Sequence, residues 1–355
     1  MIYFRSMAKI LFILGLFITL TPATSVAQLT AADKKEVISI FCEKLKQKYV
    51  FPDISEKVSS QLQKNLENGF YDTVSSKAVY AQVLTRDIRK ISNDLHLKIS
   101  HDEKVIKKQE TIADTPKSAA VFFPFEKLVR ENNFGIRSKK ILEGNIGYVE
   151  IPLFGPIDFC ADTIVGAMQF VANTDALIFD LRACRGALDE NTLLFFLSYF
   201  FPEPVHLSDL YIHEEASVKQ NWTYAWVPGK RYLDKPVYVL TSNRTFSGGE
   251  AFAYDLQQFK KAVVIGDTTR GGAHPTEFVR LNQSFACGIP YARPVNTVSK
   301  TNWEHVGVKP DINIHPDRAL TEAHLTAVRS LMANVKENGD RMKLEQLLTK
   351  LETIK

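Results

Sequence analysis

Apolar residues recur at helical spacing through the first hundred residues. The first series runs from Val37 to Tyr49 at intervals of four residues, and further series cover residues 58–66 and 79–91. Apolar positions spaced by three or four fall on one face of a helix. Pro52 separates the first two series, since proline starts a helix but interrupts its interior. The pattern predicts a small bundle of three amphipathic helices.

From Gly144 onward, short β-rich runs alternate with helical segments. Such alternation is typical of a mostly parallel sheet with right-handed crossovers, so the fold class is α/β. Two later apolar series predict terminal helices. The predicted alternating segments are residues 146–152, 162–173, 176–181, 190–200, 236–241, a helix from about 247, and 261–266, and the terminal series are 325–332 and 344–351.

The two patterns divide the chain into consecutive parts. The interval between the bundle and Gly144 is too short for a separate recognition domain, so no PDZ domain is expected. The predicted parts are a signal peptide over 1–27, a helical bundle over 28–100, a linker and lead-in strand over 101–140, an α/β catalytic core over 141–320, and C-terminal helices over 321–355.

The first residues resemble a cleavable secretory signal. Basic Arg5 and Lys9 precede an apolar run over residues 10–20, and Ser25-Val26-Ala27 offers a small-residue cleavage site. The run has about half of the ~20 residues that a membrane-spanning helix needs, so no permanent span is expected. An uncleaved anchor is the alternative. The protein is predicted to be exported, periplasmic or secreted.

Composition narrows the classes of partner. The net charge of +4 comes from 44 basic and 40 acidic residues spread along all 355 positions, so no polybasic surface is expected and nucleic acid is excluded as a partner. Export permits disulfides, but the sequence assigns no pairing to Cys42, Cys160, Cys184 and Cys287. These cysteines also lack the close Cys/His spacing of a zinc site.

The segment Thr245-Phe246-Ser247-Gly248-Gly249-Glu250 lies where a predicted strand gives way to a helix. A serine at that junction is exposed at the edge of the sheet, next to the free N–H groups of a helix N-terminus. Ser-x-x-Glu is also a capping box, which gives the serine a purely structural role. Two glycines directly after the serine favour a nucleophile, because they allow close approach of the backbone to a substrate carbonyl.

Three other segments carry polar residues at the ends of predicted elements. A buried strand ends in Asp180-Leu181-Arg182-Ala183-Cys184-Arg185-Gly186, His96 follows the helical bundle, and Glu304 lies in Trp303-Glu304-His305. Each segment alone is typical of an ordinary strand end or of a solvated or structural side chain. Taken together, in their order along the chain, these segments indicate more than each does alone.

Together these segments resemble the tail-specific serine peptidases, which include C-terminal processing peptidases, tricorn protease and the repeats of interphotoreceptor retinoid-binding protein. The similarity is greatest to the retinoid-binding-protein-like branch. It implies a crotonase-like (ClpP/crotonase-type) α/β spiral after the helical bundle. The motifs that carry it, in family order, are Asn133-Phe134-Gly135, Gly144-Asn145-Ile146-Gly147-Tyr148, Asp180-Leu181-Arg182, Thr245 to Glu250, Gly271-Gly272-Ala273-His274-Pro275 and Gly307-Val308-x-Pro310-Asp311.

The resemblance implies that Ser247 attacks the substrate carbonyl. Its own N–H or that of Gly248, together with an N–H near Gly186 and Ala187, would form the oxyanion hole. The family's strand-end motif has an asparagine where this chain has Cys184, and a second glycine where it has Ala187. Backbone donors survive both changes.

The resemblance also bears on the general base. The processing peptidases use a lysine in a Gly-Lys-Gly turn, and this chain has Gly271-Gly272-Ala273 there, so a Ser-Lys dyad is not expected. The tricorn-type arrangement maps the base onto His96 and a later glutamate onto Glu304, with Leu95 in place of a supporting serine. His274 is the alternative base. An ordinary histidine pKa of about 6.5 predicts activity that rises between about pH 6 and 7.

The leading interpretation is therefore an exported serine peptidase that cleaves peptide or protein substrates through an acyl-enzyme, at a cleft between the bundle and the core. This chemistry calls for no metal or organic cofactor. One alternative is a non-catalytic carrier of lipids or retinoid-like ligands on the same fold. The other is an inactive peptidase homologue that acts as a scaffold.

Overall fold

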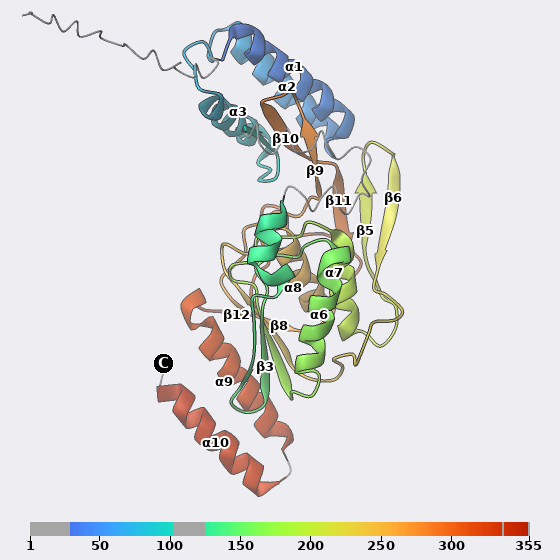
Figure 1. Ribbon diagram of the computed structural model, residues 1–355, viewed down its shortest axis with the longest axis vertical. Helices are drawn as coiled ribbons and strands as arrows, with labels where there is room; N and C mark the ends of the chain where they lie inside the picture. The colour runs from blue at the N-terminus through green and yellow to red at the C-terminus, as the bar shows by residue number, and fades with distance from the viewer. Residues whose placement is uncertain (1–28, 102–124, 336, 354–355) are drawn as a thin grey trace, which may run out of the picture.

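The computed structural model describes residues 29–101, 125–335 and 337–353 (Figure 1). The predicted signal peptide, residues 1–27, lies outside the described residues, as does most of the predicted linker. Within the described ranges, no helix is long and apolar enough to cross a membrane.

Three helices form the N-terminal region, as the apolar series predict: α1 (Ala31–Lys48), α2 (Pro52–Glu67) and α3 (Lys77–Ser92). Thr30 caps α1 in a capping box, and Pro52 occupies the first turn of α2, where its missing N–H is not needed. The apolar faces of the helices point toward each other and bury one core.

A three-stranded antiparallel sheet packs against these helices (Figure 1). Its order is β1 (Lys98–His101), β10 (Phe285–Pro290) and β9 (Thr276–Arg280). Phe285 and Ile289 belong to the same buried cluster as the helical core. A hairpin from late in the chain thus joins the N-terminal region, and it brings residues 271–275 close to the end of α3.

The central sheet has six strands in the order β12-β8-β7-β4-β3-β2. All neighbouring pairs are parallel except β2 with β3. The strands are β2 (Ser138–Leu142), β3 (Ile146–Glu150), β4 (Ala176–Asp180), β7 (Val237–Thr241), β8 (Val263–Gly266) and β12 (Ile312–Asn313).

Helices cover both faces of this sheet (Figure 1). Alternate residues of β4 point to opposite faces, so Phe179 packs among one group of helices and Ile178 among the other. The first group is α6 (Ile157–Val171), α7 (Glu190–Leu197) and α8 (Gly248–Gln258), and the second is α9 (Pro316–Asn334) and α10 (Asn338–Thr353). Short 3₁₀ turns occupy Asn133–Gly135 and Ser198–Phe200.

A third sheet, antiparallel and not expected from the sequence, has the order β11 (Ala292–Asn296), β5 (His206–Ile212) and β6 (Ser217–Trp222). It brings Ser208 and Asn296 to the cavity described below. The fold is mixed α/β with a helical N-terminal region, and the described part of the chain contains no PDZ domain.

Candidate active site

Ser247 stands in the turn between β7 and α8, directly before the first residue of the helix. Its backbone has φ 53° and ψ −117°, a conformation that costs free energy for any residue with a side chain. Such strain persists only where the surroundings hold it in place. The turn therefore fixes Ser247 at the N-terminus of α8.

Glu250 holds this turn. Its side chain is fully buried and accepts four hydrogen bonds: from the Ser247 N–H (2.7 Å), the Thr269 hydroxyl (2.5 Å), and the N–H groups of Gly271 (2.6 Å) and Gly272 (3.0 Å). Burial raises the pKa of Glu250, and the four donors oppose that rise. The capping-box partner thus also fastens the 269–272 turn to the serine.

Two backbone donors lie side by side next to Ser247. A Cβ on Gly248 would sit 2.5 Å from the Ala187 nitrogen, and both residues line the cavity. Within the described residues, neither N–H group has a hydrogen-bond acceptor. The Ser247 N–H is taken by Glu250. Of the predicted oxyanion residues, the structure brings Gly248 and Ala187 to the cavity, but not Gly186.

The two departures from the family motif are accommodated by neighbouring glycines. The Cys184 sulfur would lie 2.9 Å from a Cβ on Gly249, and the Ala187 methyl 2.3 Å from a Cβ on Gly248. Burial raises the pKa of Cys184 to about 12, so its thiol stays protonated and unreactive. All four cysteines are buried free thiols.

A cavity of about 360 Å³ opens at the serine. Ser247 and His96 both line it, although they lie 151 positions apart in the sequence. His274, the alternative base, is 2% exposed and is not among the lining residues. Only one of the two candidate histidines therefore faces the space where a substrate would bind.

His96 follows the end of α3. Its N–H donates to the Asp94 carboxylate (2.9 Å), and its ring stacks on Phe246 with the ring centres 4.6 Å apart. A Cβ on Gly272 would approach the His96 ring to 2.8 Å, so glycine is needed there. Burial lowers the pKa of His96 to about 4, although Asp94 opposes this. The imidazole is therefore neutral at neutral pH, and its Nδ1 is buried without a partner.

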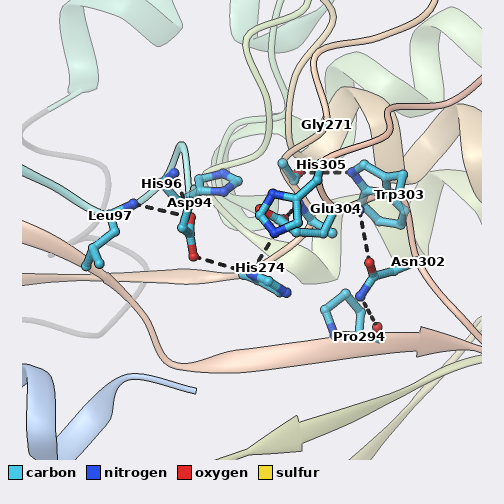
Figure 2. Close-up of polar contacts among 12 residues, drawn as sticks. Asp94, His96, Leu97, Gly271, His274, Pro294, Asn302, Trp303, Glu304 and His305 are labelled. Atoms are coloured by element: carbon cyan, nitrogen blue, oxygen red, sulfur yellow. Dashed lines mark hydrogen bonds and ion pairs between the residues drawn. The ribbon is translucent and has the colours of Figure 1, made fainter. Parts of the chain in front are cut away.

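Glu304 lies beside His274, and the side chains of both are almost fully buried (Figure 2). His274 Nδ1 lies 3.4 Å from one oxygen of Glu304 and 3.4 Å from one of Asp94. Glu304 also accepts the Ala273 N–H (2.5 Å), and Asp94 accepts the Tyr49 hydroxyl (3.1 Å). Burial raises the pKa of Glu304, with His274 opposing. For Asp94, burial acts to raise the pKa, but the contacts to His274 and His96 together lower it.

Donor atoms of Asp94, His274 and Glu304 lie within 4.8 Å of one another, which is the spacing of a small cation site. The carboxylate oxygens that face His274 already accept the Tyr49 hydroxyl and the Ala273 N–H, so a cation would compete with both donors. The contacts observed are those of a buried network in which two carboxylates share one imidazole.

The second carboxylate oxygen of Glu304, Oε1, is buried without a hydrogen-bond partner. In the described part of the chain, no hydrogen bond joins His96 to Ser247 or to Glu304. Neither Asp94 nor Phe246 is predicted from the sequence as a site residue. The Asp94 side chain accepts the N–H two residues later, a turn for which aspartate is a common signal.

Comparison with known proteins identifies the family and the fold. Residues 145–314 match peptidase family S41, and residues 19–131 match the N-terminal domain of peptidase S41 in eukaryotic IRBP. Among solved structures, mature CPAF complexed with lactacystin is similar over 90% of this chain and 99% of that chain, with 12% identity and a TM-score of 0.57.

Two further structures share the fold. A lipoprotein from Streptococcus agalactiae has 13% identity over 82% of this chain and 94% of its own, with a TM-score of 0.53. The tricorn protease has 10% identity over 90% of this chain and 37% of its own, with a TM-score of 0.50.

The fold and the matched family define a serine-type peptidase. The chain belongs to peptidase family S41, with an N-terminal region of the IRBP type.

Proposed function

We propose that this protein is exported and hydrolyses peptide bonds, with Ser247 as nucleophile and His96 as general base. One observation carries the assignment: a strained serine, two unpaired backbone N–H groups and a neutral histidine border one cavity. A residue that only capped a helix would not need this backbone strain.

In the proposed reaction, neutral His96 removes the proton from the Ser247 hydroxyl as the oxygen attacks the scissile carbonyl. The N–H groups of Gly248 and Ala187 bind the negative oxygen that develops. The histidinium then protonates the leaving amine, and the C–N bond breaks to give the acyl-enzyme. Water, deprotonated by the same histidine, releases the acid product and restores the serine.

Glu304 is the proposed electrostatic and orienting partner. Its Oε1 is buried without a hydrogen bond and lies 3.7 Å from His305 Nδ1, and the Nδ1 of His96 is buried without a partner. Buried polar atoms without hydrogen bonds are unfavourable. In the proposed mechanism the His96 segment moves when substrate binds, and Glu304 Oε1 and His96 Nδ1 then pair. His274, held between two carboxylates, is then a positioning residue for Glu304 and Asp94.

Labelling with a fluorophosphonate probe tests the proposal. The purified mature chain is expected to react at Ser247, while Ser247→Ala is unlabelled and keeps its melting temperature, because at most a cap worth about 1 kcal/mol is lost. Ser60→Ala, at an exposed serine of α2, is the matched control and labels normally. Equal labelling of Ser247→Ala and wild type would refute the nucleophile. If Ser247→Ala does not fold, Ser247→Cys replaces it.

Export is tested separately by the intact mass of the protein recovered outside the cytoplasm. A mature chain that begins at Gln28 is expected from the small-residue site at Ala27. A chain that retains the first residues would contradict cleavage.

A further inference from the structure

The cavity at Ser247 extends along one face of α8. Ser247, Ala251 and Asp255 all line it, and residues four apart lie on the same side of a helix. At about 1.5 Å of rise per residue, Ser247 and Asp255 are ~12 Å apart along the helix axis. Ala251, between them, contributes only a methyl group. The cavity thus runs from the nucleophile to a carboxylate.

Its walls and its far end differ in chemistry. Leucines at positions 188, 193, 194 and 197 line the cavity, whereas Asp255 and Asn296 provide polar groups at its far end. Lysine and arginine have an apolar stem and a charged head, so such a side chain can lie along leucines and place its cation at a carboxylate. The span from the serine to Asp255 suits a long side chain.

Two of the three carboxylates in the cavity wall are already engaged. Asp189 accepts the N–H groups of Ile157 and Asn191, which fixes it as the cap of α7. Glu190 is bound by Lys219 (3.3 Å) and Asn221 (2.8 Å). These two carboxylates therefore have structural partners.

Asp255 has fewer partners than these two carboxylates. Its one hydrogen bond comes from the Asn296 amide (2.9 Å), and within the described residues it has no ion-pair partner. It also lies near the C-terminal end of α8, where the helix dipole disfavours a negative charge. Burial raises the pKa of Asp255 to about 7, which the Asn296 contact only partly offsets. A bound cation would remove each of these disadvantages.

We propose that Asp255 selects a lysine or arginine side chain at the residue whose carbonyl Ser247 attacks. This inference rests on the proposed function, because it assigns the cavity to the substrate residue on the acyl side of the scissile bond. A carboxylate at the end of a specificity pocket is a general device for choosing basic side chains. Arg185, also in the cavity lining, is exposed and lies next to Gly186, beside the nucleophile rather than at the Asp255 end.

The test compares fluorogenic peptides that differ only in lysine, arginine, leucine or glutamate before the cleaved bond. Wild type is expected to prefer lysine or arginine over leucine in kcat/KM. Asp255→Asn should lower kcat/KM for the basic peptides about 100-fold, the scale for removing one partner of an enclosed charge pair, and should lower the ratio of basic to leucine peptide cleavage accordingly. Asp162→Asn removes a charge from an exposed site on α6 and should retain the wild-type preference.

A second arm uses wild type alone and does not depend on the variant folding. Aminobenzamidine, a compact aromatic cation, should slow fluorophosphonate labelling of Ser247, whereas neutral benzamide at the same concentration should not. Equal protection by both compounds, or a preference for leucine over basic peptides, would overturn the inference.

The outcomes also distinguish failure of the proposed function from failure of the role of Asp255. A wild-type enzyme that labels at Ser247 and cleaves leucine peptides better than basic ones keeps the proposed function and loses the role of Asp255. A chain that neither labels nor cleaves any peptide loses both.

Discussion

The two regions that meet at the cavity are held in different ways. The Ser247 turn belongs to the α/β core, and Glu250 binds it through four hydrogen bonds. The His96 segment belongs to the helical region, and its ring has an unpaired nitrogen and rests on Phe246 by stacking. The proposed nucleophile is therefore held by hydrogen bonds, whereas the ring of the proposed base is held by stacking.

The largest effect is expected when Glu250, which holds the Ser247 turn, is replaced. Glu250→Ala leaves buried backbone donors without partners, so the free energy of unfolding should fall by about 3 kcal/mol or more, and activity should be lost with it. Asp33→Ala is the matched control, because Asp33 has the same capping-box role at the exposed start of α1 and should cost about 1 kcal/mol. Chemical denaturation measures both. Equal losses would mean that Glu250 acts as a cap alone.

His96→Ala tests the region that carries the proposed general base. Loss of the general base should lower kcat at least ~100-fold at neutral pH. The melting temperature should change little, because the variant removes a buried ring with an unpaired nitrogen. Steady-state kinetics and thermal melting decide the matter. A variant with near-normal kcat would remove His96 from the mechanism.

Glu304→Gln should have a smaller effect. The amide keeps the shape and an acceptor oxygen for the Ala273 N–H, but it removes the negative charge that would stabilise a histidinium. We expect a loss in kcat below the ~100-fold of His96→Ala, with KM unchanged. A larger loss in kcat than in His96→Ala would contradict a role for Glu304 that is limited to supporting the base.

The pH dependence of kcat/KM tests the environment of His96 without any substitution. Neutral His96 is the active form, so activity is lost as pH falls below its pKa. Because burial lowers that pKa to about 4, kcat/KM should stay level from pH 7 to about pH 5 and decline below. A half-maximal point near 6.5 would show that the imidazole is solvated rather than buried.

That profile differs from the one expected from the sequence, and the reason is physical. An ordinary histidine pKa is the natural assumption when burial is unknown, and burial of His96 arises from Phe246 and Gly272, which are distant in the sequence. Glycine at position 272 gives no sign in the sequence that an imidazole rests against it.

The sequence predicts the helices better than the smaller sheets. Local periodicity is sufficient for α1, α2 and α3, whereas β1 pairs with β10 across almost two hundred residues. The motif order identifies the family and the turn at Ser247. The domain boundaries, the roles of the site residues and the crotonase-like description of the core stay predictions.

The most direct test of the account is the rate of fluorophosphonate labelling at Ser247 in wild type, His96→Ala and His274→Ala, each checked for folding by thermal melting. We expect labelling to be nearly abolished in His96→Ala. His274→Ala should label at close to the wild-type rate but melt at a lower temperature, because it leaves Asp94 and Glu304 buried without their shared partner. Normal labelling of His96→Ala beside a folded, unlabelled His274→Ala would contradict the account and make His274 the base.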